Sequence, residues 1–170
     1  MKNTIIILFI AAALGSCDSQ TKETASSTNP EQYGYTLIKS ANIDVVKEIM
    51  VNLTNYDLAK IRSHYTNSSM VHDNLIIQQI DTNLTTFAPM KKLGVKYAIE
   101  GTPLLFEVIE KPDTESGYTN YVYTHYLLSV TLNGKKYLSK LNQVFAMKDG
   151  IVLEEWDVYD TAPFIEMMKK

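Results

Sequence analysis

Residues 149–160 read DGIVLEEWDVYD, and the C-terminal half of the fold can be worked out from this stretch. Asp149 and Gly150 are a two-residue turn signal, because both residue types suit the backbone of tight hairpins. Residues 151–159 then predict a strand, in which alternate side chains point to opposite faces of a sheet. One face carries Glu155, Asp157 and Tyr159. The other carries Glu154, Trp156 and Val158, so we expect one set to line a pocket and the other to meet solvent or a second subunit.

The residues before this stretch predict further antiparallel strands. From Gly94 onward, β-branched and aromatic residues alternate with turn residues, as in a meander of hairpins. The expected strands cover residues 95–101, 104–109, 118–132, 136–147 and 151–159. The turns between the later strands are expected at residues 112–117, 133–134 and 149–150.

The residues before Gly94 predict helices. Apolar residues recur at helical spacing behind Asn42 and Asp44, which are suitable N-caps, and again over residues 58–67. A short strand is expected at residues 69–73, and a third helix over residues 76–88, capped by Asp73 or Asn74 and ended or kinked by Pro89. Helices first and a meander afterwards predict an α+β domain, with the helices covering one face of a curved sheet.

Two stretches resemble the nuclear transport factor 2-like (NTF2-like, or SnoaL-like) superfamily. Residues 45–74, VVKEIMVNLTNYDLAKIRSHYTNSSMVHDN, are similar to its opening helices and a strand that ends in Asp, and residues 149–160 are similar to its closing hairpin. The resemblance covers residues 43–162. It implies a cone-shaped, cystatin-like fold in which three N-terminal helices pack on a curved, mostly antiparallel sheet around a pocket open at one end. Because such folds carry many functions, the fold alone assigns none.

The resemblance also implies two candidate catalytic residues. Asp73 matches the carboxylate base of steroid-isomerase members, although Ile49 stands where those members carry a Tyr donor. Asp157 matches the acid/base of SnoaL-type cyclases, with Glu155 in place of a His. The simpler interpretation, which general residue preferences favour, makes Asp73 an N-cap and leaves Glu155 and Asp157 as solvated surface carboxylates, with Trp156 in the core.

The long strand at residues 118–132 adds aromatic candidates on both faces. Tyr121, Tyr123 and His125 alternate on one face, and Tyr126 stands on the other. His125 is a candidate partner of Asp157 across strands. The candidate ligand-binding residues are Tyr65, Tyr121, Tyr123 and Tyr159, although strand packing is the commoner role of such side chains. The three His residues lack zinc-site spacing, so we expect no metal, and no motif implies a cofactor.

The first residues predict a lipoprotein signal. The apolar run at residues 5–14 is too short to span a bilayer, which needs ~20 apolar residues. Residues 14–17, LGSC, resemble the bacterial lipobox, in which cleavage leaves an acylated Cys17 as the first residue. We therefore expect a signal peptide at residues 1–16, a polar tether at 17–36 and the domain at 37–170, held by lipid on a membrane of the bacterial cell envelope, inner or outer.

These features predict three alternative functions. The first is an envelope lipoprotein that binds a small apolar or amphipathic ligand. The second is an isomerase, dehydratase or cyclase that uses a pocket Asp as acid/base. The third is an interaction module that forms a homodimer through the outer sheet face. A formal net charge of −3 argues against nucleic acid as a partner.

Overall fold

The computed structural model describes residues 35–109 and 120–168. The predicted signal peptide, Cys17, most of the predicted tether and the predicted loop at 112–117 lie outside these residues.

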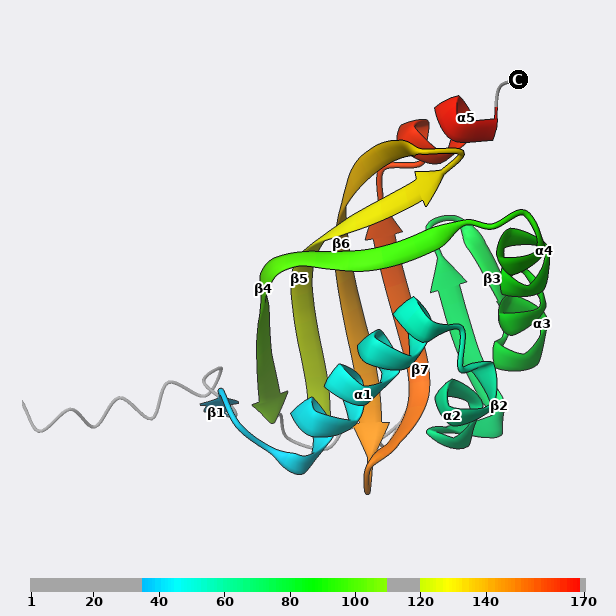
Figure 1. Ribbon diagram of the computed structural model, residues 1–170. Coiled ribbons are helices and arrows are strands. Elements are labelled where there is room, and N and C mark those ends of the chain that lie inside the picture. The colour runs from blue at the N-terminus through cyan, green and yellow to red at the C-terminus, as the bar shows by residue number, and fades with distance from the viewer. Residues whose placement is uncertain (1–34, 110–119, 169–170) are drawn as a thin grey trace, which may run out of the picture. The chain divides into compact units, whose positions relative to one another are not determined.

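A curved sheet of seven strands forms the main layer of the described chain (Figure 1). The strands are β1 (Tyr35–Leu37), β2 (Tyr65–Asp73), β3 (Ile76–Gln79), β4 (Lys96–Ile109), β5 (Asn120–Leu132), β6 (Lys135–Lys148) and β7 (Ile151–Tyr159). Their order across the sheet is β1-β4-β5-β6-β7-β2-β3. Neighbouring strands are antiparallel except β2 and β7, which run parallel. The expected α+β class with a curved, mostly antiparallel sheet is confirmed.

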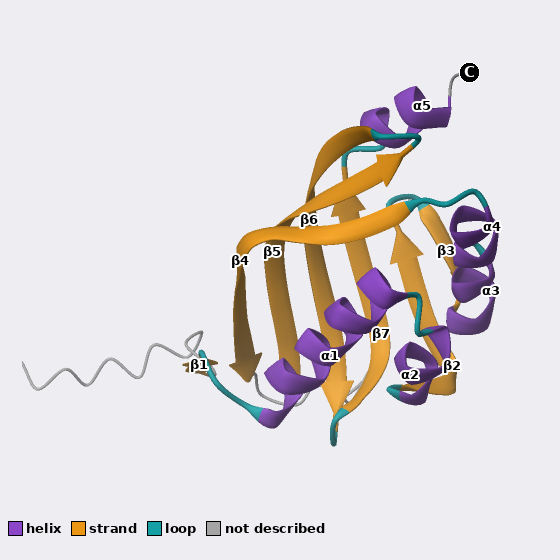
Figure 2. Ribbon diagram, in the orientation of Figure 1, coloured by secondary structure: helices purple, strands orange, loops and turns teal. Residues whose placement is uncertain are grey.

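The longest helix, α1 (Ala41–Asn55), crosses the concave face of this sheet (Figure 2). The shorter helices are α2 (Leu58–Ser63), α3 (Ile80–Thr85), α4 (Phe87–Lys92) and α5 (Ala162–Met168). In the described part of the chain, no helix is both long and apolar enough to cross a membrane.

The position of α1 follows from its cap and its apolar face. The Ser40 hydroxyl accepts a hydrogen bond from the Ile43 backbone N–H at 3.0 Å, which satisfies one free donor at the helix start. Ile43 and Val46 are fully buried, and they belong to the same core cluster as Phe145 and Val152 from the sheet. Each such side chain contributes roughly 1.5–3 kcal/mol through burial, so this contact holds α1 on the sheet.

Two predicted helices differ in the structure. The second ends at Ser63 and Tyr65 begins strand β2, so the helix is shorter than the expected 58–67. The expected third helix at residues 76–88 is wrong: residues 76–79 form β3, which pairs with β2, and two short helices follow. Ile76 and Ile77 are 61% and 64% exposed, so they do not form the buried face of a helix, and backbone pairing with β2 makes this segment a strand. Pro89 lies in the first turn of α4, where its missing N–H is tolerated.

The two strands expected at 95–101 and 104–109 are one bent strand, β4. The β4–β5 register shifts between Glu100 and Leu104, and Gly101 there has a φ of +72°. An irregularity of this kind bends a strand without ending it. Two further elements were not predicted from the sequence: β1, which pairs with the end of β4, and α5.

Candidate functional site

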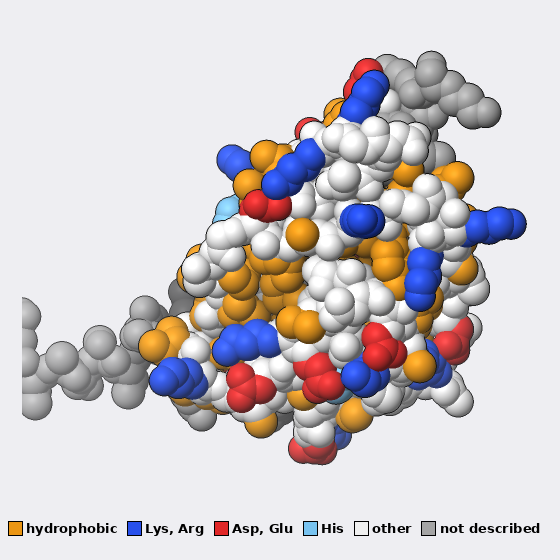
Figure 3. Space-filling view, in the orientation of Figure 1, with side chains coloured by type: hydrophobic (Ala, Val, Ile, Leu, Met, Phe, Trp, Pro, Cys, Tyr) orange, Lys and Arg blue, Asp and Glu red, His pale blue; other side chains and the backbone are white. Residues whose placement is uncertain are grey.

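A cavity of about 310 Å³ lies between the helices and the concave face of the sheet. Most of its wall is apolar, with the helices contributing Ile49, Met50, Leu53, Leu84, Phe87 and Met90. Figure 3 shows hydrophobic side chains gathered in the hollow between α1 and the bent strand β4. The cavity therefore has the apolar wall typical of small-molecule sites.

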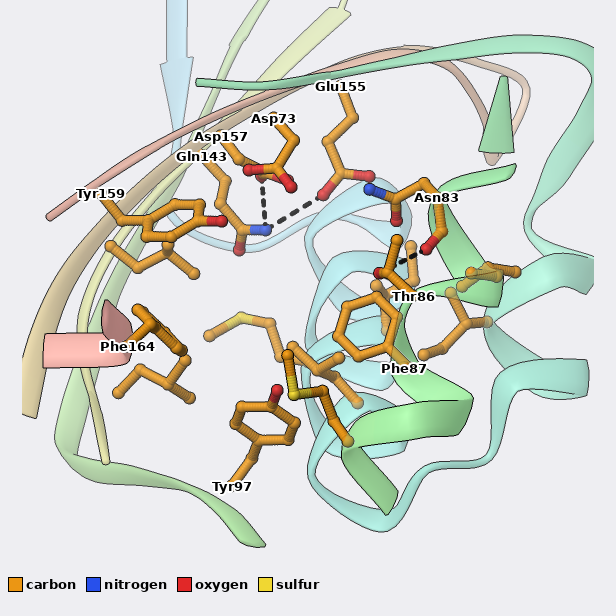
Figure 4. Close-up of a pocket in the computed structure, with 18 of the residues that line it drawn as sticks. Asp73, Asn83, Thr86, Phe87, Tyr97, Gln143, Glu155, Asp157, Tyr159 and Phe164 are labelled. Carbon is orange, nitrogen blue, oxygen red and sulfur yellow. Dashed lines mark hydrogen bonds between the residues drawn. The ribbon is translucent and has the colours of Figure 1, made fainter. Parts of the chain in front are cut away.

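Carboxyl groups gather at one end of this cavity (Figure 4). The Tyr65 hydroxyl donates to Glu155 Oε2 at 2.6 Å, and Gln143 Nε2 donates to Glu155 Oε1 at 3.0 Å. The same Gln143 nitrogen donates to Asp157 Oδ1 at 2.8 Å. Gln143 thus holds Glu155 and Asp157 together in what we call the Glu155/Asp157 pair.

Sheet register brings a third carboxyl group to this end. Asp73, the last residue of β2, is the register partner of Asp157 on the parallel strand β7. The next residue, Asn74, has a φ of +53°, and its side-chain oxygen accepts from the Tyr159 backbone N–H at 3.1 Å. Its own N–H donates to the Asp157 carbonyl at 2.8 Å, so this turn ties the end of β2 to β7.

The Glu155/Asp157 pair holds a proton unusually tightly. Burial raises the pKa of both carboxyl groups, and the negative charge of Glu155 further raises the pKa of Asp157. No Lys, Arg or His is among the described residues that line the cavity, so no nearby cation offsets these effects. The pair therefore keeps a proton at pH values where ordinary carboxyl groups are ionised.

Asp73 has a separate neighbour. Burial raises the pKa of Tyr159, and the Asp73 carboxyl group close to its hydroxyl raises that pKa further. Tyr159 also packs edge-on against Phe164 of α5, with ring centroids 5.5 Å apart. An aromatic wall consequently stands next to the Asp73 carboxylate.

Asn83 completes the polar end from the helix side. Figure 4 shows its amide, on α3, at the same end of the cavity as Glu155. The residue is only 8% exposed and lines the cavity, and within residues 35–109 and 120–168 its side-chain amide makes no hydrogen bond. Buried amides are usually paired, so this one has hydrogen-bonding capacity directed at the cavity.

The structure brings together four of the predicted site residues: Tyr65, Asp73, Asp157 and Tyr159. Glu155, Asp157 and Tyr159 share the inward face, as the strand alternation predicted. The interpretation of Glu155 and Asp157 as surface carboxylates is therefore wrong. Asp73 is not a helix N-cap either, because it ends β2 and α3 begins only at Ile80.

Three other candidates lie on the opposite face of the sheet. Tyr121, Tyr123 and His125 point away from the cavity, because the buried positions of β5 are the alternate ones that include Tyr126. His125 is exposed and pairs with Asn142 at 2.7 Å, so it is not a partner of Asp157. Trp156 lies on this outer face as well, stacked on His72 with centroids 5.2 Å apart, and not in the core.

Two residues of the site, Gln143 and Asn83, were not predicted from the sequence, and Tyr126 belonged to one of the two faces of β5 between which the sequence left the choice open. The Tyr126 hydroxyl donates to Gln143 Oε1 at 2.9 Å, which leaves the Gln143 nitrogen to face the carboxyl groups. Strand alternation alone could have placed Gln143 on the inward face with Leu141 and Phe145. No comparable sequence pattern points to Asn83, a single Asn within a helix. In the described ranges, no group of three or more His, Cys, Asp or Glu side chains could hold a metal ion.

Comparison with known proteins identifies the fold. No protein-family model and no curated protein sequence matches the chain. Among solved structures, an NTF2-like protein of unknown function from Burkholderia pseudomallei K96243 is similar with a TM-score of 0.58 and 14% identity, over 78% of this chain and 100% of that one. An NTF2-like protein from Burkholderia xenovorans LB400 has a TM-score of 0.56 and 8% identity, over 78% and 100%. An LEH-like epoxide hydrolase from M. tuberculosis has a TM-score of 0.53 and 14% identity, over 75% and 89%. The fold is that of NTF2-like proteins.

Proposed function

We propose that the cavity binds a small, mostly apolar molecule with its polar group at the carboxyl end. One observation carries this proposal: an apolar cavity of about 310 Å³ ends at Asp73 and the Glu155/Asp157 pair. Ligand sites commonly measure about 300–1,000 Å³, so the ligand is small. That an epoxide hydrolase shares the fold supports a small-molecule function.

Binding of a neutral, environment-sensitive fluorophore such as N-phenyl-1-naphthylamine tests the proposal. We expect saturable fluorescence enhancement with the wild type. Met90→Trp should abolish it, because a larger side chain fills the cavity from its wall. Thr82→Trp, an exposed position on α3 outside the cavity, is the matched control and should bind like the wild type. Equal binding by both variants, or none by the wild type, would contradict the proposal.

A second candidate function is acid–base catalysis on the bound molecule. The observation that favours it is the proton held by the Glu155/Asp157 pair beside a second acid, Asp73, because an enzyme needs both a proton donor and a proton acceptor at the reacting atom. In this scheme Asp73 removes a proton from carbon and the pair donates one to a developing oxyanion.

Incorporation of solvent deuterium next to the carbonyl of a small ketone, such as cyclohexanone, tests the second candidate by mass spectrometry. Asp73→Asn should lower the exchange rate by about 10²–10⁴-fold, the usual contribution of a positioned acid or base. Asp44→Asn, an exposed position on α1, should not. Exchange no faster than in buffer would exclude this reaction and leave the binding function.

The predicted lipid anchor would place this function at a bacterial envelope, through acylation of Cys17. Expression of the full chain in a Gram-negative host, followed by detergent phase partitioning and mass spectrometry of the N-terminal peptide, tests this part. We expect a lipid-modified Cys17 and a detergent-phase protein. Cys17→Ala should be recovered in the aqueous phase, and an unmodified wild-type Cys17 would contradict the anchor.

A further inference from the structure

The polar end of the cavity contains many hydrogen-bond acceptors and few donor groups of the protein that are still free. The hydroxyls of Tyr65 and Tyr126 already donate to Glu155 and Gln143, and the Gln143 nitrogen already donates to the pair. Asp73 lies beside Tyr159 and lines the cavity, so its carboxyl oxygens can accept hydrogen bonds from a ligand. A ligand group placed beside Asp73 is therefore favoured if it donates hydrogen bonds.

Asn83 supplies independent evidence that a ligand group is missing at this end. Asn83 is more than nine-tenths buried, and among the described residues its amide is unpaired and lies in the cavity wall at the same end as Glu155. The amide can therefore hydrogen-bond to a ligand group in the cavity. The amide oxygen of Asn83 adds a further acceptor to those of Asp73.

Charge favours a cation over a neutral donor. Three carboxyl groups face the cavity, and its described lining contains no Lys, Arg or His. A carboxylate ligand would meet both like charge and unpaired acceptors, so the site disfavours it. The ring of Tyr159, which lies near Asp73 and packs against Phe164, can face a cation with its π-electrons.

We propose that the ligand is an amine with a mostly apolar body, whose ammonium group lies between Asp73 and Asn83. This inference rests on the proposed binding function and names the ligand class for the same cavity. The ammonium donates to the Asp73 carboxylate and to the Asn83 amide oxygen. The apolar body extends along the wall that α1 and α4 provide.

Binding of such a cation releases a proton. The Glu155/Asp157 pair keeps its proton because burial raises the pKa of both acids and the Glu155 charge further raises that of Asp157, with no Lys, Arg or His in the described cavity lining to offset this. A bound ammonium supplies that charge and lowers the pair's pKa, so the proton passes from the pair to the buffer. Calorimetry in buffers of different ionisation heat should therefore report proton release for an amine and none for an alcohol of equal length.

The first experiment compares octylamine, octanol and octanoate as competitors of the bound neutral fluorophore near neutral pH. The three share one apolar body and differ in charge. We expect octylamine to bind at least ~10-fold more tightly than octanol, as one charge-assisted hydrogen bond provides, and octanoate to bind most weakly. If octanol or octanoate competes as well as octylamine, the amine inference is overturned while ligand binding stands. If the fluorophore itself does not bind, the proposed function fails first.

The second experiment uses variants of the two residues that would hold the ammonium. Asp73→Asn and Asn83→Leu should each weaken octylamine by ~10-fold and change octanol much less. A wild-type affinity for the fluorophore shows that the cavity of a variant is folded. If one of the two variants does not fold, the other still tests the inference. Asp44→Asn, a solvent-exposed acid on α1, is the control for charge and should not change either affinity. Equal losses for amine and alcohol would overturn the inference.

Discussion

The hydrogen bond from Tyr126 fixes the orientation of the Gln143 side-chain amide next to the two acids. Because the Gln143 oxygen accepts from Tyr126, the amide nitrogen faces Glu155 and Asp157 and donates to both. An amide nitrogen cannot neutralise two carboxylates as a cation would. The pKa of both acids is therefore raised, and the protonated pair is favoured over the fully ionised pair.

This leads to a pH prediction for stability. The folded-state pKa of both acids is raised, so between the ordinary carboxyl pKa of about 4 and the raised value the folded chain binds more protons than the unfolded chain. This contribution to the free energy of unfolding is fully present below about pH 4 and decreases as pH rises through the raised pKa. One retained proton gives a slope of up to about 1.4 kcal/mol per pH unit.

Urea unfolding of wild type and Asp157→Asn between about pH 5 and about pH 8 measures this slope. The Asn variant keeps the shape of the side chain and cannot ionise, so its stability should depend less on pH. Asp44→Asn, which changes an exposed acid, should keep the wild-type slope. Parallel profiles for wild type and Asp157→Asn would show that the pair does not retain a proton.

Among the secondary-structure elements, the bent strand β4 shapes the cavity. The part of β4 that precedes the irregularity at Gly101 places Tyr97 in the cavity wall, where it contacts Phe87 of α4. The last part pairs with β1 and β5. A straight strand could not follow both parts of the sheet, so Gly101 is needed for its positive φ and not for close packing, since space around it is open.

Substitutions at Gly101 test this role. Gly101→Val should lower the free energy of unfolding by about 1–3 kcal/mol, because a β-branched residue is strained at positive φ. Gly101→Asn should cost less, since Asn adopts this conformation more readily. Thermal and urea unfolding would measure the stability of both variants, and fluorophore binding would show whether each keeps the cavity. Similar stabilities for the two variants would mean that positive φ is not required there.

For the whole molecule, the outer face of the sheet carries apolar side chains opposite the cavity. One row across β4, β5, β6, β7 and β2 contains Phe106, Tyr123, Val144, Trp156 and His72. In the next row, Leu104 and Val158 are 58% and 60% exposed and flank His125 and Asn142. Exposed apolar surface can mark an interface. In a two-fold dimer, such a row would lie against its own copy.

We therefore predict a homodimer through this outer face. Sedimentation velocity should show a dimer for the wild type and a monomer for Leu104→Lys/Val158→Lys, because charges at the centre of the interface would lose water without gaining partners. Val51→Lys, at a position of 54% exposure on α1, controls for added charge and should remain dimeric. A wild type that stays monomeric at all concentrations would rule out this interface.

Local sequence patterns placed some site residues on the correct face and could not place others. The alternation of Glu155, Asp157 and Tyr159 on one face was predicted correctly, because the pleat of a strand is a local property. His125 was expected as a candidate partner of Asp157, but β5 carries aromatic residues on both faces, and only packing against the helices shows that the other face lines the cavity. Asn83 had no local signal at all, since its significance is the missing partner of a buried amide.

The sequence by itself predicted the features that depend on backbone preferences within a few residues. These are the strands of the meander, the turns at residues 133–134 and 149–150, and the shared face of the acids on β7. Two features became clear only in the folded chain: residues 76–79 form a strand beside β2, and β2 lies parallel to β7 with Asp73 opposite Asp157. The physical reason is that register between distant strands depends on burial and hydrogen bonding across the whole sheet. A local sequence pattern therefore cannot show which face of a strand points toward the cavity.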